Sequence, residues 1–266
     1  MISYDLETCL MKKGKSRKDV LILSIGAVDL IEERKFHCYV NPLGSAKATY
    51  MHDLENYGVR VKPTNTVMTN IHWRHEKAIE VQEALEKFDA FVNAAKPILG
   101  KVILVAHNGR SFDHKILRGT YERANCRLPD FAYLDSWHDI TKKGWPKQRS
   151  HKLQDLHRSL CCNSLLQPKW HQSLDDAEAL AEIIYSTAIE ETAKRPRQAW
   201  SYARNHVILE QLNKNYAMKL SPELRLCKRS QRAWPDVVRK SAVRSKELRL
   251  FCLEFCIKQI WQRYLR

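Results

Sequence analysis

Asp5 and Glu7 stand two residues apart at the end of the first apolar run, residues 2–8. If this run is a strand, alternate side chains face opposite ways, so Ser3, Asp5 and Glu7 share one face. Two carboxylates about 7 Å apart on one face repel each other, and a divalent cation would remove that cost. The pair therefore predicts part of a metal site, provided that further carboxylates arrive from elsewhere in the chain.

Two later segments supply such carboxylates. The apolar run 102–106 is typical of a strand buried on both faces, and His107 and Asn108 end it. Ser111 is expected to cap a helix over 111–124, which places Asp113 in its first turn at the sheet edge where ligands bind. The other segment, residues 171–176, lies further along the chain.

His171 and Asp176 form the third group, five positions apart. Ser173 is expected to cap the helix that carries Asp176. The inner stripe of this helix is predicted to consist of Leu174, Ala177, Ala181, Ile184 and Ala188. Taken singly, Asp113 and Asp176 also suit a plainer role, because acids in a first helical turn favour the helix dipole.

The ordered set Asp5-x-Glu7, His107-Asn108 with Phe112-Asp113, and His171 with Asp176 resembles the three exonuclease motifs of the DnaQ-like (DEDDh) 3′–5′ exonucleases. The resemblance covers about residues 1–192 and is nearest to the three-prime repair exonucleases and the exonuclease-like domain of promyelocytic leukaemia proteins. It implies phosphodiester hydrolysis with two Mg²⁺ ions, for which Mn²⁺ can substitute.

The resemblance also implies a role for each residue. Asp5 would bridge both ions, Glu7 and Asp176 would complete the shell of one, and Asp113 would support the other. His171 would take a proton from the attacking water, since histidine titrates near neutral pH. The implied substrate-binding residues are Thr8, Leu10, His107 and Asn108. For His107 and Asn108 the alternative is a strand end with satisfied hydrogen bonds.

Charge is distributed unevenly along the 266 residues, which carry a formal net charge of +15. Residues 195–266 hold 17 Lys and Arg against 5 Asp and Glu, whereas residues 1–194 are nearly balanced with 28 against 25. This favours nucleic acid as the partner. We expect an exonuclease domain over 1–194 and a basic helical C-terminal region over 195–266, with apolar stripes at residues 200–216 and 248–264.

The compartment is predicted to be the cytosol or the nucleus. The eight cysteines include no C-x-x-C pair, which fits a reducing environment. Neither a signal peptide nor a membrane-spanning segment is recognised. His151, His157, Cys161 and Cys162 lie close enough in the sequence to suggest a zinc site, but they lack a familiar ligand spacing, so a packed helix is the favoured interpretation.

The remaining pattern predicts an α/β, RNase H-like mixed five-stranded sheet flanked by helices. Strands are expected at 20–30, 35–40 and 131–135, helices at 78–95 and 153–160, and a loop-rich stretch at 41–76. Asp135 is a further acid near a strand end and a secondary candidate for the site.

The leading function is a 3′–5′ exonuclease that acts on DNA, preferably single-stranded, and releases nucleoside monophosphates. One alternative is a 3′–5′ exoribonuclease, because the sugar contacts near Thr8 do not resolve DNA from RNA. Others are a non-catalytic nucleic-acid binding module and a proofreading subunit that docks on a polymerase. The sequence gives no oligomeric state.

Overall fold

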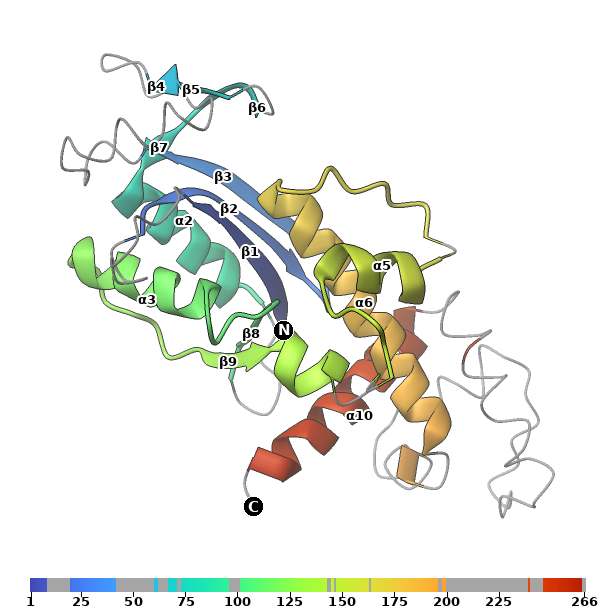
Figure 1. Ribbon diagram of the computed structural model, residues 1–266. Helices are drawn as coiled ribbons and strands as arrows, with labels where there is room; N and C mark the ends of the chain where they lie inside the picture. The colour runs from blue at the N-terminus through green and yellow to red at the C-terminus, as the bar shows by residue number, and fades with distance from the viewer. Residues whose placement is uncertain are drawn as a thin grey trace, which may run out of the picture.

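A six-stranded mixed sheet forms the centre of the protein, in the strand order β7-β3-β2-β1-β8-β9 (Figure 1). The computed structural model describes residues 1–8, 20–41, 60–61, 67–70, 73–95, 101–142, 145, 147–162, 164–195, 198–199, 239 and 246–264. The strands of the sheet are β1 (Ile2–Thr8), β2 (Ile22–Asp29), β3 (Lys35–Asn41), β7 (Ile79–Glu80), β8 (Ile103–Ala106) and β9 (Ala132–Asp135).

The first three strands are antiparallel, as predicted, and Asp5 of β1 lies opposite Gly26 of β2. The strands β8 and β9 join β1 in parallel register, with Ser3 opposite Val105. The mixed α/β sheet flanked by helices agrees with the predicted RNase H-like fold. Its strand number is corrected from five to six, because β7 adds a short parallel pairing of Ile79 with Val40.

Helices cover both faces of the sheet (Figure 1). On one face, α2 (Val81–Asn93) and α3 (Asp113–Arg123) pack over Ile2, Tyr4 and Leu6 of β1. On the other face, α6 (Ser173–Lys194) and α10 (Lys246–Tyr264) form a second apolar core with Met1. The period-two alternation of β1 therefore sends Ile2, Tyr4 and Leu6 into one core, while Ser3 faces α6 and donates to the Ala177 carbonyl at 2.9 Å.

The inner stripe predicted for α6 is confirmed: Ala177, Ala181, Ile184 and Ala188 are buried and Leu174 is half-buried. The remaining elements are the π-helix η4 (Ser136–Thr141) and α5 (Leu153–Leu160), which lies against α6. Among the described residues, none of the helices combines the length and apolarity that a membrane crossing requires.

Both predicted helix caps are wrong. The chain makes hydrogen-bonded turns after β8, with Ser111 N–H donating to the Asn108 carbonyl at 3.0 Å, so α3 begins only at Asp113. The Ser173 hydroxyl contacts the Ser24 hydroxyl at 2.9 Å instead of capping α6, whose cap residue is Gln172. At Ser173, a tertiary contact with β2 replaces the local hydrogen bond that a capping side chain would make.

Two other segments also differ from the prediction. The helix expected at 78–95 spans only 81–93, because residues 79–80 form β7. The stretch 41–76, expected to be loop-rich, includes most of a three-stranded sheet of β4 (Arg60–Val61), β5 (Val67–Asn70) and β6 (Trp73–Lys77). These strands are short and lack the apolar alternation that identifies a half-buried strand.

The C-terminal region is described in part. The predicted stripe at 248–264 falls on α10, whose buried residues Phe251 and Phe255 share an apolar core with α6. Arg239 pairs with Glu190 of α6, Nη2 to Oε2 at 3.0 Å. The stripe predicted at 200–216 and the basic residues Lys228, Arg229, Arg232, Lys240 and Arg244 lie outside the described residues.

Candidate active site

Asp5 and Glu7 extend from the same face of β1, as the strand period requires, and both are half-buried. β1 pairs with β8 at Ile2 and Ser3 and with β2 along its whole length, so the ladder with β2 holds the backbone where the two carboxylates leave it. The antiparallel register shifts between Glu7 and Thr8, which ends the regular ladder just beyond the acids. The strand thus presents two carboxylates at a fixed separation.

Asp113 comes from the first turn of α3 and is only 3% exposed. Its carboxylate accepts hydrogen bonds from the backbone amides of Leu6 and of Asp113 itself, which tie the start of α3 to β1. These hydrogen bonds partly offset the effect of burial, which raises the pKa of Asp113 to about 7. A third carboxyl group therefore lies beside β1 in a position set by backbone donors.

Asp176 and His171 come from the start of α6 and the segment before it. The His171 amide donates to Asp176 Oδ2 at 3.1 Å, and His171 itself adopts a left-handed backbone with φ 67°. Ligand atoms of Glu7, His171 and Asp176 all lie within 4.8 Å of one another. The structure therefore brings this histidine and both acids together, with the His171 side chain exposed and the Asp176 side chain buried.

Electrostatic repulsion is concentrated at this point. Burial, followed by the charges of Asp113, Asp176 and Glu7, raises the pKa of Asp5 well above its usual range. Burial, Asp176 and Asp113 raise the pKa of Glu7 to about 8. Burial raises the pKa of Asp176 to about 6, although the hydrogen bond from the His171 amide and the charge of the His171 ring lower it. Four carboxyl groups that all resist ionisation form a site that a bound cation would stabilise.

The donor set suits a hard divalent cation. Asp176 Oδ1 is buried and has no hydrogen-bond partner, so one carboxylate oxygen is left for a ligand. Carboxylate oxygens are the ligands that Mg²⁺ prefers, and Mg²⁺ completes its shell with water. Asp5, Glu7, Asp113 and Asp176 therefore fit the divalent ions expected from the sequence.

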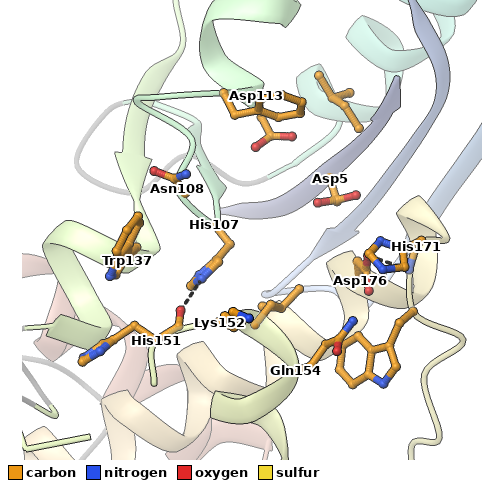
Figure 2. A pocket seen from close by; sticks show the side chains of 14 residues that line it. Asp5, His107, Asn108, Asp113, Trp137, His151, Lys152, Gln154, His171 and Asp176 are labelled. Carbon is orange, nitrogen blue, oxygen red and sulfur yellow. Dashed lines mark hydrogen bonds between the residues drawn. The ribbon is translucent and has the colours of Figure 1, made fainter. Parts of the chain in front are cut away.

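A cavity of about 740 Å³ opens over these carboxylates (Figure 2). Figure 2 shows Asp5, Asp113, Asp176 and His171 around the same space. Its further lining includes His107, Asn108, Phe112, Trp137, His151, Lys152, Gln154 and Trp170. The cavity has the size of a small-molecule pocket rather than of a groove for a duplex.

His107 and Asn108, the predicted substrate-binding residues, line the cavity, and both also have structural roles. His107 Nε2 donates to the His151 carbonyl at 2.8 Å, so Nδ1 accepts from the Ser136 hydroxyl at 2.9 Å. Asn108 adopts φ 57°, and its Oδ1 is buried without a hydrogen-bond partner. Thr8 is the last residue of β1, and Leu10 lies outside the described residues.

Trp137, Lys152 and Trp170 were not identified from the sequence as candidates, although each lines the cavity. They lie on η4, before α5 and before α6, in segments without a strong apolar period. The one available signal was their chemistry, because aromatic rings and a lysine are typical of surfaces that bind single-stranded nucleic acid.

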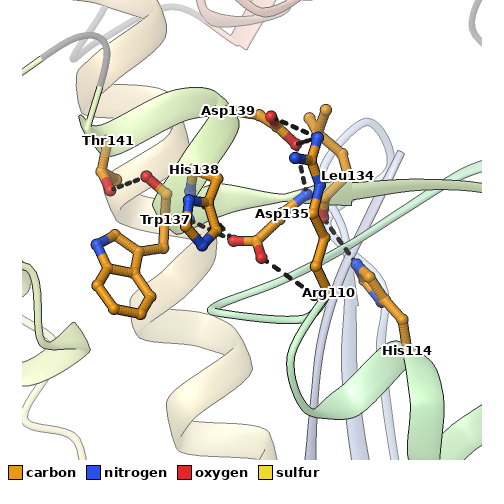
Figure 3. Close-up of polar contacts among 8 residues, drawn as sticks. All are labelled: Arg110, His114, Leu134, Asp135, Trp137, His138, Asp139 and Thr141. Atoms are coloured by element: carbon orange, nitrogen blue, oxygen red, sulfur yellow. Dashed lines mark hydrogen bonds and ion pairs between the residues drawn. The ribbon is translucent and has the colours of Figure 1, made fainter.

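A polar network around the buried carboxylates of Asp135 and Asp139 holds η4, whose Trp137 lines the cavity (Figure 3). Arg110 Nη2 binds Asp139 Oδ1 at 2.7 Å, and the Arg110 amide donates to Asp135 Oδ2 at 3.0 Å. Asp135 Oδ1 accepts from the amides of Trp137 and His138 at 2.9 and 3.2 Å. Asp135, the secondary candidate, thus fixes the first turn of η4 and the position of Trp137.

A mixed sheet with carboxylates at one strand and a histidine beside them defines a metal-dependent nuclease type of site. The family model described as Exonuclease (RNase_T) matches residues 2–184, and the chain therefore belongs to this exonuclease family. The predicted DnaQ-like membership is confirmed, and the family supports nuclease function. Among curated protein sequences, none matches significantly.

Three solved structures are similar to this chain at low identity. Exonuclease X in complex with 5′-overhanging duplex DNA is 15% identical, with 69% of this chain and 87% of that chain covered and a TM-score of 0.43. The nuclease domain of 3′hExo, a DEDDh family member bound to rAMP, is 15% identical, with coverages of 68% and 88% and a TM-score of 0.46. The zinc-bound E. coli ExoI–ssDNA complex is 13% identical, with coverages of 80% and 44% and a TM-score of 0.48.

Proposed function

We propose that this protein is a metal-dependent 3′–5′ exonuclease that removes nucleoside 5′-monophosphates from DNA, with single-stranded 3′ ends preferred. The observation that carries the proposal is the arrangement of Asp5, Asp113, Asp176 and His171 around one cavity. A carboxylate oxygen of Glu7 lies within 4.8 Å of ligand atoms of His171 and Asp176, and Oδ1 of Asp176 has no hydrogen-bond partner. Membership of the exonuclease family supports the reaction class. The preference for DNA rests on the resemblance to three-prime repair exonucleases.

Each acid has a defined place in this proposal. Asp5, Glu7 and Asp176 would hold one Mg²⁺ ion, and Asp113 with Asp5 would hold a second. When bound, the ions neutralise phosphate charge and lower the pKa of a coordinated water. The raised pKa values of Asp5 and Glu7 mean that these side chains bind protons readily whenever no cation compensates their charge.

The reaction then requires one proton acceptor and one leaving oxygen. His171 accepts a proton from the attacking water, whose oxygen forms the new bond to phosphorus. The bond between phosphorus and the 3′ oxygen of the preceding nucleotide breaks, and that oxygen takes a proton from solvent. The exposed side chain of His171 allows it to return its proton to water after each turnover.

The cavity supports attack at a chain end. Its volume of about 740 Å³ suits one terminal nucleotide. Lys152 on its wall is placed to contact a backbone phosphate, while Trp137 and Trp170 offer rings on which a base can stack. We propose these three as substrate-binding residues alongside His107 and Asn108. We also propose that the enzyme acts in the cytosol or the nucleus.

Digestion of end-labelled oligonucleotides tests the proposal. Matched DNA and RNA strands, labelled at the 5′ end, are incubated with the full chain in Mg²⁺ or in EDTA. We expect a ladder that shortens from the 3′ end, mononucleotide products, faster loss of DNA and no reaction in EDTA. Faster loss of RNA would make the protein an exoribonuclease. Intact strands that still bind a folded protein would make it a non-catalytic binding module.

A further inference from the structure

A second group of metal-ligating side chains lies between α5 and α6, apart from the proposed active site. His157 and Cys161 are four residues apart at the end of α5, so they share one face of that helix. Glu182 reaches them from α6. One ligand atom each from His157, Cys161 and Glu182 lies within 4.8 Å of the other two. The sequence spacing did not reveal this group, because Glu182 joins it only through the packing of two helices.

The donor atoms are already held in place by neighbours. Glu182 Oε2 contacts His157 Nε2 at 2.7 Å, while Glu182 Oε1 accepts from the Ser164 hydroxyl at 2.8 Å. Cys161 Sγ lies 3.5 Å from the Ser186 hydroxyl of α6. The contacts with Ser164 and Ser186 are of the kind that orient metal ligands in proteins, whereas the His157–Glu182 contact joins two donor atoms that would share the ion.

The separations are close to those of a tetrahedral site. Bond lengths of about 2.0 Å to nitrogen or oxygen and about 2.3 Å to sulfur place neighbouring donors roughly 3.3–3.5 Å apart. The His157–Glu182 contact of 2.7 Å must open slightly. Cys161 Sγ, which lies within 4.8 Å of the other two donor atoms, must approach them by about 1.3 Å at most. Side-chain rotations supply movements of this size.

The fourth position of such a site is accessible to water. Cys161, Ser164, Glu182 and Ser186 line a cavity of about 520 Å³, whose wall is completed by residues of the sheet and of α10, among them Lys35 and Arg249. An ion could enter from this cavity, and a water molecule could complete its shell. His157 does not line this cavity and is only 6% exposed.

We propose that His157, Cys161 and Glu182 bind a single transition-metal ion, best suited to Zn²⁺, which links α5 to α6. The thiolate and imidazole donors favour Zn²⁺ over Mg²⁺ or Ca²⁺, which prefer oxygen ligands. The site is independent of the proposed nuclease ions because it shares no residue with the carboxylates around Asp5.

The bound ion would stabilise the segment that leads to the active-site cavity. The ring of Trp170 packs edge-on against the ring of His157 at 5.8 Å, and Trp170 also lines the cavity over Asp5. His171 follows directly. Fixing His157 on α6 therefore restricts Trp170 and the chain that carries His171.

Titration of the metal-free, reduced full chain with Co²⁺ tests the site. A cysteine ligand produces a near-ultraviolet thiolate-to-cobalt band, which the oxygen and imidazole donors of the active site do not produce. We expect this band to saturate at one equivalent, to disappear when Zn²⁺ is added, and to be absent in Cys161→Ser. Glu182→Gln should weaken binding at least about tenfold, by loss of a ligand.

Cys162→Ser is the matched control, because Cys162 is an exposed neighbour outside the group. It should keep the wild-type band and affinity. Circular dichroism establishes that every variant is folded. A wild-type protein without the band, or a band that persists in folded Cys161→Ser, would overturn the proposal whatever the nuclease assay shows.

Discussion

Of the four site acids, Asp5 has the most neighbours of like charge, since Asp113, Asp176 and Glu7 all raise its pKa beyond the effect of burial. Each carboxylate beside it makes the others harder to ionise. The same repulsion that destabilises the metal-free site becomes attraction for a divalent ion. Neutralising Asp5 should therefore cause the largest loss of activity and, at the same time, raise the stability of the metal-free protein.

We predict that Asp5→Asn lowers the rate by about 10³-fold or more, the scale of losing a central electrostatic group. The same variant should melt at a higher temperature than the wild type in EDTA at pH 8, because one repelling charge is gone. Activity on a labelled oligonucleotide and thermal melting give both values. A variant that keeps its activity would remove Asp5 from the site.

His171 should act on chemistry more than on metal binding. His171→Ala is expected to lower kcat by about 10²–10⁴-fold, the usual contribution of a general base. Its affinity for Mn²⁺, measured by calorimetry, should change little, because the carboxylates remain. A large loss of Mn²⁺ affinity with kcat unchanged would instead make His171 a metal ligand.

Gly26 determines how closely α6 approaches the sheet. A Cβ atom on Gly26 would lie 2.1 Å from the Ser173 carbonyl carbon and 2.2 Å from the Leu174 amide nitrogen, both backbone atoms. Backbone cannot move aside as a flexible side chain can. The start of α6, and with it Asp176, depends on the absence of a side chain at this position of β2.

Gly26→Ala is therefore expected to destabilise the fold by at least about 1–3 kcal/mol, the usual cost of overpacking. Activity should fall as well, because displacement of α6 moves Asp176 from Asp5. Ser24→Ala, which removes the hydroxyl contact with Ser173 without adding bulk, should cost only about 1 kcal/mol. Denaturant unfolding compares the two. Equal effects would show that close approach at Gly26 is unimportant.

The alternation of β1 and the position of Asp113 after a buried strand could be predicted because period and strand ends are local properties of a sequence. The close approach at Gly26 could not, since it depends on a helix 147 residues further along the chain that packs by tertiary contact. The predicted cap at Ser173 failed for the same reason, since its hydroxyl contacts Ser24 of β2. The predicted cap at Ser111 failed for a local reason, because turns after β8 delay the start of α3 to Asp113. Trp137 and Lys152 enter the cavity only through the network around Asp135 and the turn before α5.

The described C-terminal helix is part of the protein's main packing. Phe251 of α10 is fully buried in the core that contains Met1 and Ala177. Arg249 of α10 also binds Glu33, in the turn between β2 and β3, at 2.7 Å. The boundary at residue 194 stays a prediction about sequence organisation, whereas α10 itself packs directly on α6.

Phe251→Ala should accordingly destabilise the protein by about 3–5 kcal/mol, the range for deleting a buried aromatic side chain. Leu165→Ala is the control, because Leu165 is 97% exposed and should change stability by less than about 0.5 kcal/mol. Chemical denaturation followed by circular dichroism measures both. A cost below about 1 kcal/mol for Phe251→Ala would show that α10 contributes little to the fold.

Stability should depend on pH through the site acids. Glu7 and Asp113 have folded pKa values of about 8 and about 7, above the ordinary value of about 4. The folded protein therefore holds protons that the unfolded chain has released, and these acids reduce stability as pH rises towards 8. A bound divalent ion replaces those protons and removes the penalty.

Mg²⁺ should consequently raise the melting temperature above its value in EDTA, and this increase should grow between about pH 6.5 and 8.5. That pH range lies above the ordinary pKa of histidine. The comparison at each pH cancels groups elsewhere in the protein, such as the buried Met1 amine, whose pKa burial lowers to about 6. If the increase in melting temperature were the same across this pH range, the metal ion would not be replacing protons on these acids.

Anomalous scattering from a crystal soaked in Mn²⁺ tests the central claim most directly, because it locates the ions without reference to activity. We predict one Mn²⁺ peak in contact with Asp5, Glu7 and Asp176, and a second between Asp5 and Asp113. Mn²⁺ bound elsewhere, with these four carboxylates free of metal at saturating concentration, would contradict the proposed nuclease site.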